Sequence, residues 1–135
     1  MNHIHFIEKV DDAFGGLPLV EQVLHRSNNI NDKTTKYWCV AYDIMSVTDE
    51  EEERTYNINF YAAERMDEKD AEPNIHFSIG MEILRDGLRQ LEAENYEITI
   101  KFPLTFYMNS VKFADVLDVV QMSVNITVEN YEDCE

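Results

Sequence analysis

The histidines are the side chains of this sequence best suited to bind a metal ion, so their spacing is the first question. His3 and His5 stand two residues apart, and a pair of imidazoles can contribute two ligands to a metal ion. No cysteine or aspartate cluster supports them, and a chain end of this kind tends to fray. His25 and His76 are isolated in the sequence. The spacing therefore predicts no metal site, and chelation by the first pair is only a weaker alternative.

The sequence gives little indication of a catalytic nucleophile. Cys39 follows Trp38 in a segment of alternating apolar residues, which is typical of a packed thiol rather than a reactive one. No serine stands in the setting of a nucleophile elbow, and no glycine-rich loop has the spacing of a nucleotide-binding motif. The carboxylates are so numerous that a catalytic pair would not stand out among them. We therefore expect no catalytic residue, no cofactor and no enzymatic activity, and an enzyme with scattered carboxylates remains an alternative.

The charge of the chain narrows the classes of partner. There are 27 acidic and 11 basic residues, which gives a formal net charge of -16. A protein surface that binds nucleic acid or an anionic membrane requires basic residues, so the acidic charge disfavours both partners. An acidic surface can instead keep DNA from adhering, or it can imitate DNA. Besides these, the usual explanation of acidity is a solvated surface.

The terminal segment and the hydropathy pattern address targeting. Charged residues interrupt the apolar residues of Met1 to Val10, so we expect no signal peptide. No apolar run reaches the 18 or more residues of a membrane span. The two cysteines, Cys39 and Cys134, are too few for a disulfide framework and indicate a reducing compartment.

The element that must organise the fold is a helix predicted over residues 74–94. Its apolar residues recur at steps of three, four and one, as in an amphipathic helix: Ile75, Ile79, Ile83, Leu84, Leu88 and Leu91. Pro73 stands just before it, where a missing N–H costs little. Gly80 and Gly87 each cost about 1 kcal/mol against alanine in a helix. We expect a close approach to a sheet or to a neighbouring subunit to compensate for them.

The N-terminal part, residues 1–26, is predicted to be a broken helix. Ile4, Ile7, Val10 and Phe14 have helical spacing, and Gly15-Gly16 interrupts it. A second short helix is expected to resume at Leu17 and continue to residue 26. The polar residues 27–35 are then predicted to form a loop.

Strands are predicted on both sides of the central helix. Residues 36–63 form a long β-hairpin, with alternating apolar residues in each strand. Its tip is a block of five adjacent acids that cannot be buried, Asp49, Glu50, Glu51, Glu52 and Glu53. The tip is either a solvated loop or an arm that contacts a neighbour. Residues 96–128 supply a second strand pair, in which Pro103 indicates a bulge or an edge strand, and residues 129–135 form an acidic tail.

These elements predict one domain, residues 1–135, of the α+β class. The expected fold is a two-layer sandwich in which helices cover one face of a four-stranded, mainly antiparallel sheet, with the element order α-β-β-α-β-β. The other face would carry uncharged polar residues: Thr55, Asn57, Asn59, Ser123, Asn125 and Thr127. Such a face is either simply solvated, or it packs on another subunit or lines a narrow channel.

Two segments resemble small proteins of tailed phages and prophages of Bacteroides-like hosts, crAss-like phages included. In the first, Phe60 to Leu88, a strand ends in an aromatic residue and an acid-Arg pair, an acidic loop leads to Asn, and a helix of I-x-x-x-G-x-x-x-L type follows. The matching residues are Tyr61, Glu64, Arg65, Asp70, Asn74, Ile75 or Ile79, Gly80 and Leu84. In the second, Phe102 to Val128, the pattern is K-F-A-D followed by a final alternating strand, here Lys112, Phe113, Ala114 and Asp115. The element order is also similar to that of tail-terminator and neck-ring proteins.

The resemblance implies a structural virion protein of the phage neck or tail. Its subunits would form a six- or twelve-fold homo-oligomeric ring, a tail terminator or head–tail connector, in contact with the portal or other ring proteins. DNA would pass through an acidic channel without being bound, and no membrane would be involved. The protein would be made in the host cytoplasm and end in the virion. Candidate interface residues are Asp49, Glu50, Glu51, Glu52, Glu53, Asn57, Asn59, Lys112, Phe113, Asp115 and Asn125. The alternative is an acidic DNA mimic or immunity-type inhibitor of a basic enzyme.

Overall fold

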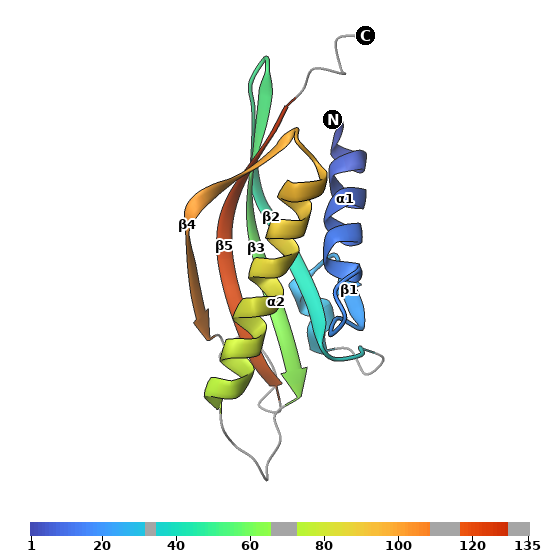
Figure 1. Ribbon diagram of the computed structural model, residues 1–135, viewed down its shortest axis with the longest axis vertical. Helices are drawn as coiled ribbons and strands as arrows, with labels where there is room; N and C mark the ends of the chain where they lie inside the picture. The colour runs from blue at the N-terminus through green and yellow to red at the C-terminus, as the bar shows by residue number, and fades with distance from the viewer. Residues whose placement is uncertain (32–34, 66–72, 109–116, 130–135) are drawn as a thin grey trace.

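A five-stranded mixed sheet forms one layer of the molecule, and two α-helices lie side by side on one of its faces (Figure 1). The computed structural model describes residues 1–31, 35–65, 73–108 and 117–129. In spatial order the strands are β1 (Gln22–Leu24), β2 (Cys39–Asp49), β3 (Glu53–Arg65), β5 (Leu117–Glu129) and β4 (Ile98–Met108). The helices are α1 (His3–Gly15) and α2 (Pro73–Glu94), and a short 3₁₀ helix, η1 (Ser27–Asn31), follows β1.

The predicted four-stranded, mainly antiparallel sheet with the order α-β-β-α-β-β is wrong. Residues 22–24, expected to be helical, form β1 instead, which lies parallel to β2 with Val23 opposite Val40. The physical reason is that the first residues of β2, on the side away from β3, have main-chain groups that need hydrogen-bond partners. Three residues of β1 satisfy them, and a segment this short has little helix propensity to oppose that pairing. The sheet therefore has five strands and is mixed.

The two long inner strands carry most of the sheet. β3 and β5 are antiparallel over 13 residues without an irregularity, from the Glu53–Glu129 pair to the Arg65–Leu117 pair. β2 and β4 flank them, and each contains one shift of register, after Ile44 in β2 and between Lys101 and Thr105 in β4. Pro103 lies within the second irregularity. The irregularities of the sheet therefore lie in β2 and β4, whereas β3 and β5 pair without interruption.

The core lies between the helices and the sheet. Alternate residues of β3 and β5 point toward the helices and are fully buried, among them Tyr56, Phe60, Met122 and Ile126. From the other side, α1 contributes Phe6 and Phe14, and α2 contributes Leu84 and Leu91. A smaller apolar cluster lies on the opposite face of the sheet, where Ile30 of η1 packs near Cys39, Ala41, Tyr61, Ala63, Leu117 and Val119.

The two glycines of α2 lie where the helix approaches its neighbours most closely. A Cβ added at Gly80 would collide with Val120 of β5, and one at Gly87 would collide with Phe14 of α1. The cost of glycine in a helix is therefore offset by contact with β5 at one position and with α1 at the other.

The hairpin formed by β2 and β3 extends past the helices at one end of the molecule (Figure 1). It closes with a hydrogen bond of 2.8 Å from the Glu50 main-chain N–H to the Glu53 carbonyl oxygen. No helix in the described part of the chain is both long and apolar enough to cross a membrane.

Candidate functional site

Within the described part of the chain, the side chains that could bind a metal ion do not gather in one place. Within residues 1–31, 35–65, 73–108 and 117–129, no group of three or more His, Cys, Asp and Glu side chains could hold a metal ion. His3 is stacked on Tyr56, with its Nδ1 3.0 Å from the tyrosine hydroxyl, whereas His5 is exposed. Residues two positions apart on a helix point in different directions, so His3 and His5 are poorly placed to bind one metal ion together.

The Cys39 thiol is buried on the face of the sheet that η1 covers. Burial raises its pKa to about 12, and the negative charge of Glu64 acts in the same direction. A thiol with a raised pKa holds very little thiolate at neutral pH, and the thiolate is the nucleophilic form. Cys39 is therefore a packing residue.

The structure gives two histidines a carboxylate partner that sequence reasoning missed. The His76 Nδ1 of α2 lies 2.7 Å from a carboxylate oxygen of Asp118 at the start of β5, and the ring also contacts Trp38 edge-on. The His25 Nε2 lies 2.9 Å from Asp11, which also accepts a hydrogen bond of 3.0 Å from the Tyr42 hydroxyl.

Both pairs connect elements of the fold. His76–Asp118 joins α2 to β5, and the Asp11 pair joins α1 to the chain that follows β1. Burial raises the pKa of Tyr42, and the neighbouring Asp11 adds to the effect. The partners are 42 and 14 residues apart in the sequence, so no local signal pointed to them.

The predicted polar residues of β3 and β5 lie together on the sheet face opposite the helices, and they form a ladder of cross-strand hydrogen bonds. Asn57 donates from its Nδ2 to Asn125 Oδ1 at 2.9 Å, and the Thr55 and Thr127 hydroxyls are 3.2 Å apart. Ser123 donates its hydroxyl proton to Asn59 at 2.6 Å. These side chains of β3 and β5 are uncharged and bond to one another across the strands, and Lys101 of β4 lies beside them, opposite Asn125.

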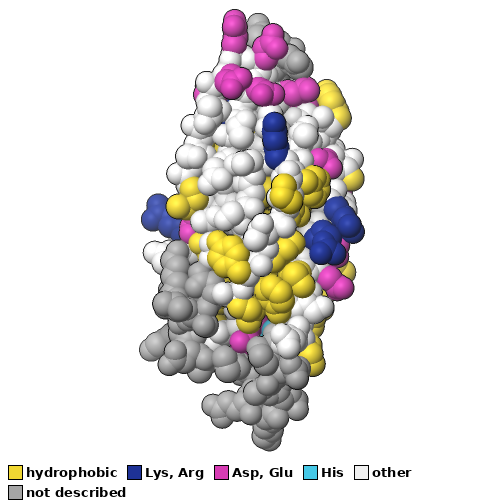
Figure 2. All heavy atoms as spheres, turned by 90° about the vertical axis from the view of Figure 1, so that its left-hand side faces the viewer, with side chains coloured by type: hydrophobic (Ala, Val, Ile, Leu, Met, Phe, Trp, Pro, Cys, Tyr) yellow, Lys and Arg dark blue, Asp and Glu magenta, His cyan; other side chains and the backbone are white. Residues whose placement is uncertain are grey.

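The five acids of the hairpin tip are distributed around its turn. Asp49 lies 3.4 Å from the Arg54 guanidinium across the hairpin, and Glu50, Glu51 and Glu52 are exposed beyond it. A hydrogen bond to Tyr56 raises the pKa of Arg54 further, so this cation stays charged. Figure 2 shows the acidic side chains gathered at this end of the molecule.

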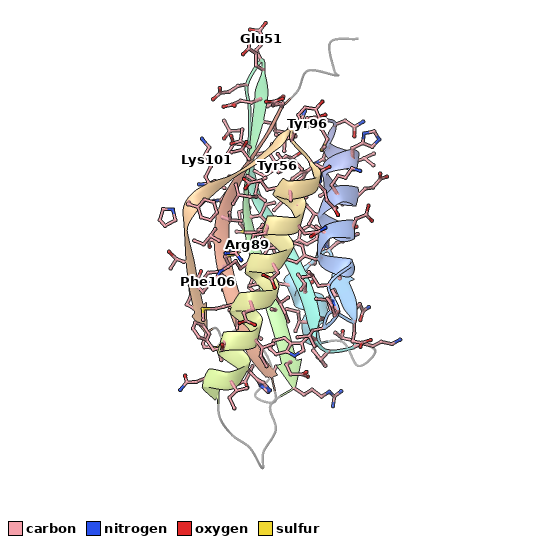
Figure 3. The ribbon with its side chains drawn as sticks, viewed as in Figure 1. Glu51, Tyr56, Arg89, Tyr96, Lys101 and Phe106 are labelled. Carbon is pink, nitrogen blue, oxygen red and sulfur yellow. The ribbon has the colours of Figure 1, made fainter. Side chains whose placement is uncertain are left out.

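The β4 edge exposes several apolar side chains. Phe102 is 70% exposed, and Tyr107 and Met108 are about two-fifths exposed. In Figure 2 hydrophobic side chains cover the edge that faces the viewer, and basic residues lie around them. Figure 3 places Lys101 and Phe106 on β4 and Arg89 on the neighbouring helix α2, at a distance from Glu51 at the hairpin tip. Arg85 of α2 lies over the Phe106 ring, 5.9 Å from its centre.

Eight of the eleven candidate interface residues are therefore placed on two surfaces. Asn57, Asn59 and Asn125 lie on the polar face, and Asp49–Glu53 form the hairpin tip. The other three, Lys112, Phe113 and Asp115, lie outside the described residues. The apolar β4 edge was not among the candidates, although its signal was present in the sequence as a strand with one cation and no acid.

No protein-family model matches the chain, and no curated protein matches it.

Proposed function

We propose that the protein is a structural subunit of a tailed-phage virion that assembles head-to-tail into a homo-oligomeric ring of the neck or tail. The observation that carries this proposal is the presence of two chemically different edges on one sheet, neither of which is fully paired by a strand of the described residues. The β4 edge exposes Phe102 and carries Lys101, whereas the projecting part of β2 exposes Met45 and Val47 and leads into the acidic tip. A ring contact requires two different complementary patches on every subunit.

Charge supports the passage of DNA through such a ring. With a net charge of -16, the assembled subunits would repel phosphates, so a duplex would move past them without being held. The Asn57–Asn125 and Thr55–Thr127 pairs of the polar face are uncharged, and the cation that borders them is Lys101 of β4, opposite Asn125. The phage-type pattern of Phe60 to Leu88 and Phe102 to Val128 supports the same assignment.

The test of this proposal is the native mass of the purified chain over a concentration series, with negative-stain imaging of the largest species. A closed ring of six or twelve copies is the expected result, and duplex DNA added at moderate salt should not be retained. A chain that stays monomeric up to millimolar concentration, or rings that hold DNA, would contradict the proposal.

A lining or contact role of the polar face is tested separately by Asn57→Lys with Asn125→Lys. The two lysines would place cations on the face, so the rings should either fail to form or begin to retain DNA. Rings that form normally and still release DNA would remove this face from the proposal.

The second candidate is an acidic inhibitor that imitates DNA. The observation that favours it is the collection of acidic side chains at one end of the molecule (Figure 2). In that case the chain would bind a basic enzyme as a 1:1 complex that salt weakens, and it would not self-assemble. The mass measurement therefore separates the two functions.

A further inference from the structure

We infer that the open half of β4 pairs with the open half of β2 in a second copy of this chain, so that the sheet continues from one subunit to the next. The inference rests on the proposed head-to-tail assembly and specifies the contact that produces it. The partner is the chain itself, and the argument starts from the main-chain groups that the two edge strands leave without a strand beside them.

Among the described residues, the outer side of β4 lacks hydrogen-bond partners only in its second half. The Glu129 N–H donates to the Glu97 carbonyl oxygen, so by the alternation of an antiparallel ladder the main-chain groups of Ile98 and Ile100 point away from β5. Both N–H groups already have acceptors, Asn95 O for Ile98 and the Glu92 carboxylate for Ile100.

After the irregularity, Thr105 and Tyr107 lie opposite Ser123 and Gln121 of β5. The same alternation then points the main-chain groups of Leu104, Phe106 and Met108 outward. Among the described residues no strand pairs with this side of β4, which leaves about five residues of exposed ladder.

Among the described residues, no strand pairs with the outer side of β2 in the half that β1 does not reach. β1 ends with Leu24 opposite Ala41, and beyond it a hollow of about 410 Å³ separates residues 25–28 from Asp43 and Ile44, so the open half starts after Ile44. The Glu50–Glu53 hydrogen bond sets the alternation, so Ile44, Val47 and Asp49 direct their main-chain groups outward. This half of β2 is also about five residues long.

The directions of the strands make the two edges compatible. β2, β3, β5 and β4 are successively antiparallel, so β4 and β2 run in opposite directions within one subunit. A neighbour rotated about an axis close to the strand direction would therefore set its β2 antiparallel to β4, the more stable kind of pairing. The exposed apolar side chains of Met45, Val47 and Tyr107 would then be covered at the contact.

Charge complementarity follows from the same arrangement. In the register that sets Phe106 opposite Val47 of the next copy, Lys101 lies toward the hairpin end of that copy, beside its acidic tip. Arg85 lies over Phe106, and Arg89 is one helical turn nearer to the same end. Lys101 and Arg89 would therefore lie nearest to the acids at positions 49–53, whereas two β4 edges brought together would place like charges side by side.

The direct test is chemical cross-linking between two variants in a Cys134→Ser background. Each variant then has one introduced, accessible cysteine, because the remaining Cys39 is buried. Thr105→Cys and Thr48→Cys are exposed on the polar face and lie opposite each other in this register. A short bismaleimide should join the two variants when they are mixed but should join neither variant to itself. Lys9→Cys on α1 serves as the control and should give no product with either.

A chain that carries both cysteines should give a ladder of cross-linked products that ends at the number of subunits in the ring. Rings without the mixed product would overturn this inference and leave the proposed assembly intact. Products of Thr105→Cys with itself would overturn it in favour of a two-fold β4 contact. A chain that is monomeric at every concentration would overturn both proposals.

A charge exchange tests the register independently. Lys101→Glu should weaken association at least tenfold, and adding Glu51→Lys with Glu52→Lys should restore most of it. Lys9→Glu changes the net charge equally and should have a much smaller effect. A Lys101→Glu variant that behaves as Lys9→Glu does, or that the tip lysines fail to rescue, would overturn the predicted contact between the edge and the tip.

Discussion

At the scale of single residues, the histidine–carboxylate pairs fix elements that are remote in the sequence. His76 and Asp118 are both largely shielded from water, whereas His25 of the other pair is mostly exposed. A buried carboxylate that loses its partner keeps its desolvation cost, whereas an exposed pair contributes little. The two pairs therefore should differ in their effect on stability, although their geometry is similar.

We predict that His76→Ala lowers the free energy of unfolding by about 1–3 kcal/mol, because Asp118 loses its hydrogen-bond partner. The matched variant His25→Ala removes the exposed pair and should cost less than about 1 kcal/mol. Urea denaturation followed by circular dichroism measures both. Equal losses in the two variants would show that burial of the pair is not what matters.

We further predict that Cys39 is unreactive in the folded protein. In a Cys134→Ser variant, a disulfide reagent at pH 8 should label no thiol until the chain is unfolded, because Cys39 is buried and its pKa is raised to about 12. Raising the pH to 10, above the ordinary thiol pKa of 9.0, should still give little labelling of the folded state. It should, however, reduce stability, since only the unfolded chain then releases the thiol proton. Rapid labelling at pH 8 would contradict the structure at this position.

At the scale of elements, α2 depends on how closely it approaches its neighbours. We predict that Gly80→Ala destabilises the fold by about 1–3 kcal/mol, because the added methyl group collides with Val120. The gain in helix propensity, about 1 kcal/mol, is too small to offset this. Thermal unfolding of the single and double variants with Val120→Ala measures the coupling between the two positions.

Gly15→Ala is the control for this prediction. A Cβ at Gly15 would lie 3.8 Å from Val23, an ordinary contact, so this substitution should be neutral or slightly stabilising. If Gly80→Ala is as harmless as the control, or if Val120→Ala does not relieve it, the close approach of α2 to β5 is not what requires the glycine.

Elements whose apolar residues repeat regularly over many positions could be predicted from the sequence. Elements that form only because a partner distant in the sequence pairs with them could not. The apolar stripe from Ile75 to Leu91 predicts a helix over residues 74–94, and α2 spans Pro73–Glu94. β1 has three residues, too few for a periodic signal, and it exists because β2 needs a parallel neighbour. The fold class was wrong for this reason, since one short strand turned a four-stranded sheet into a five-stranded mixed one.

The candidate site follows the same rule. Alternation predicts that Asn57 and Asn125 face the same side of the sheet, whereas their 2.9 Å hydrogen bond depends on the β3–β5 register. Periodicity does not say which strands lie at the edges, but Pro103 predicted an edge position or a bulge, and β4 has both. The exposure of Phe102 was not predicted. The partners of His25 and His76 were likewise set by tertiary structure.

At the scale of the whole molecule, the excess of acid opposes self-assembly. Copies that each carry a formal charge of -16 repel one another, and added salt screens this repulsion. The uneven distribution of charge allows association in spite of it. From Ile98 to Met108, β4 carries Lys101 and no acid, while the hairpin turn carries five acids in sequence. The attraction between these two regions is local, whereas the repulsion acts between whole subunits.

The opposition between local attraction and general repulsion leads to a prediction in which two charge-matched variants respond in opposite directions. Replacing Glu50, Glu51 and Glu52 by glutamine removes three charges that the inferred contact uses, so association should weaken several-fold although the copies repel each other less. In the control variant, Glu8, Asp12 and Glu21 are replaced by their amides. These exposed acids lie in α1 and in the segment that connects it to β1, so the variant loses the same net charge without a change at the contact. Association of this control should strengthen, because only the repulsion is reduced. Sedimentation velocity of the two variants and the original chain at low and moderate salt measures the difference. Equal strengthening in both variants would place the hairpin tip away from the contact between subunits.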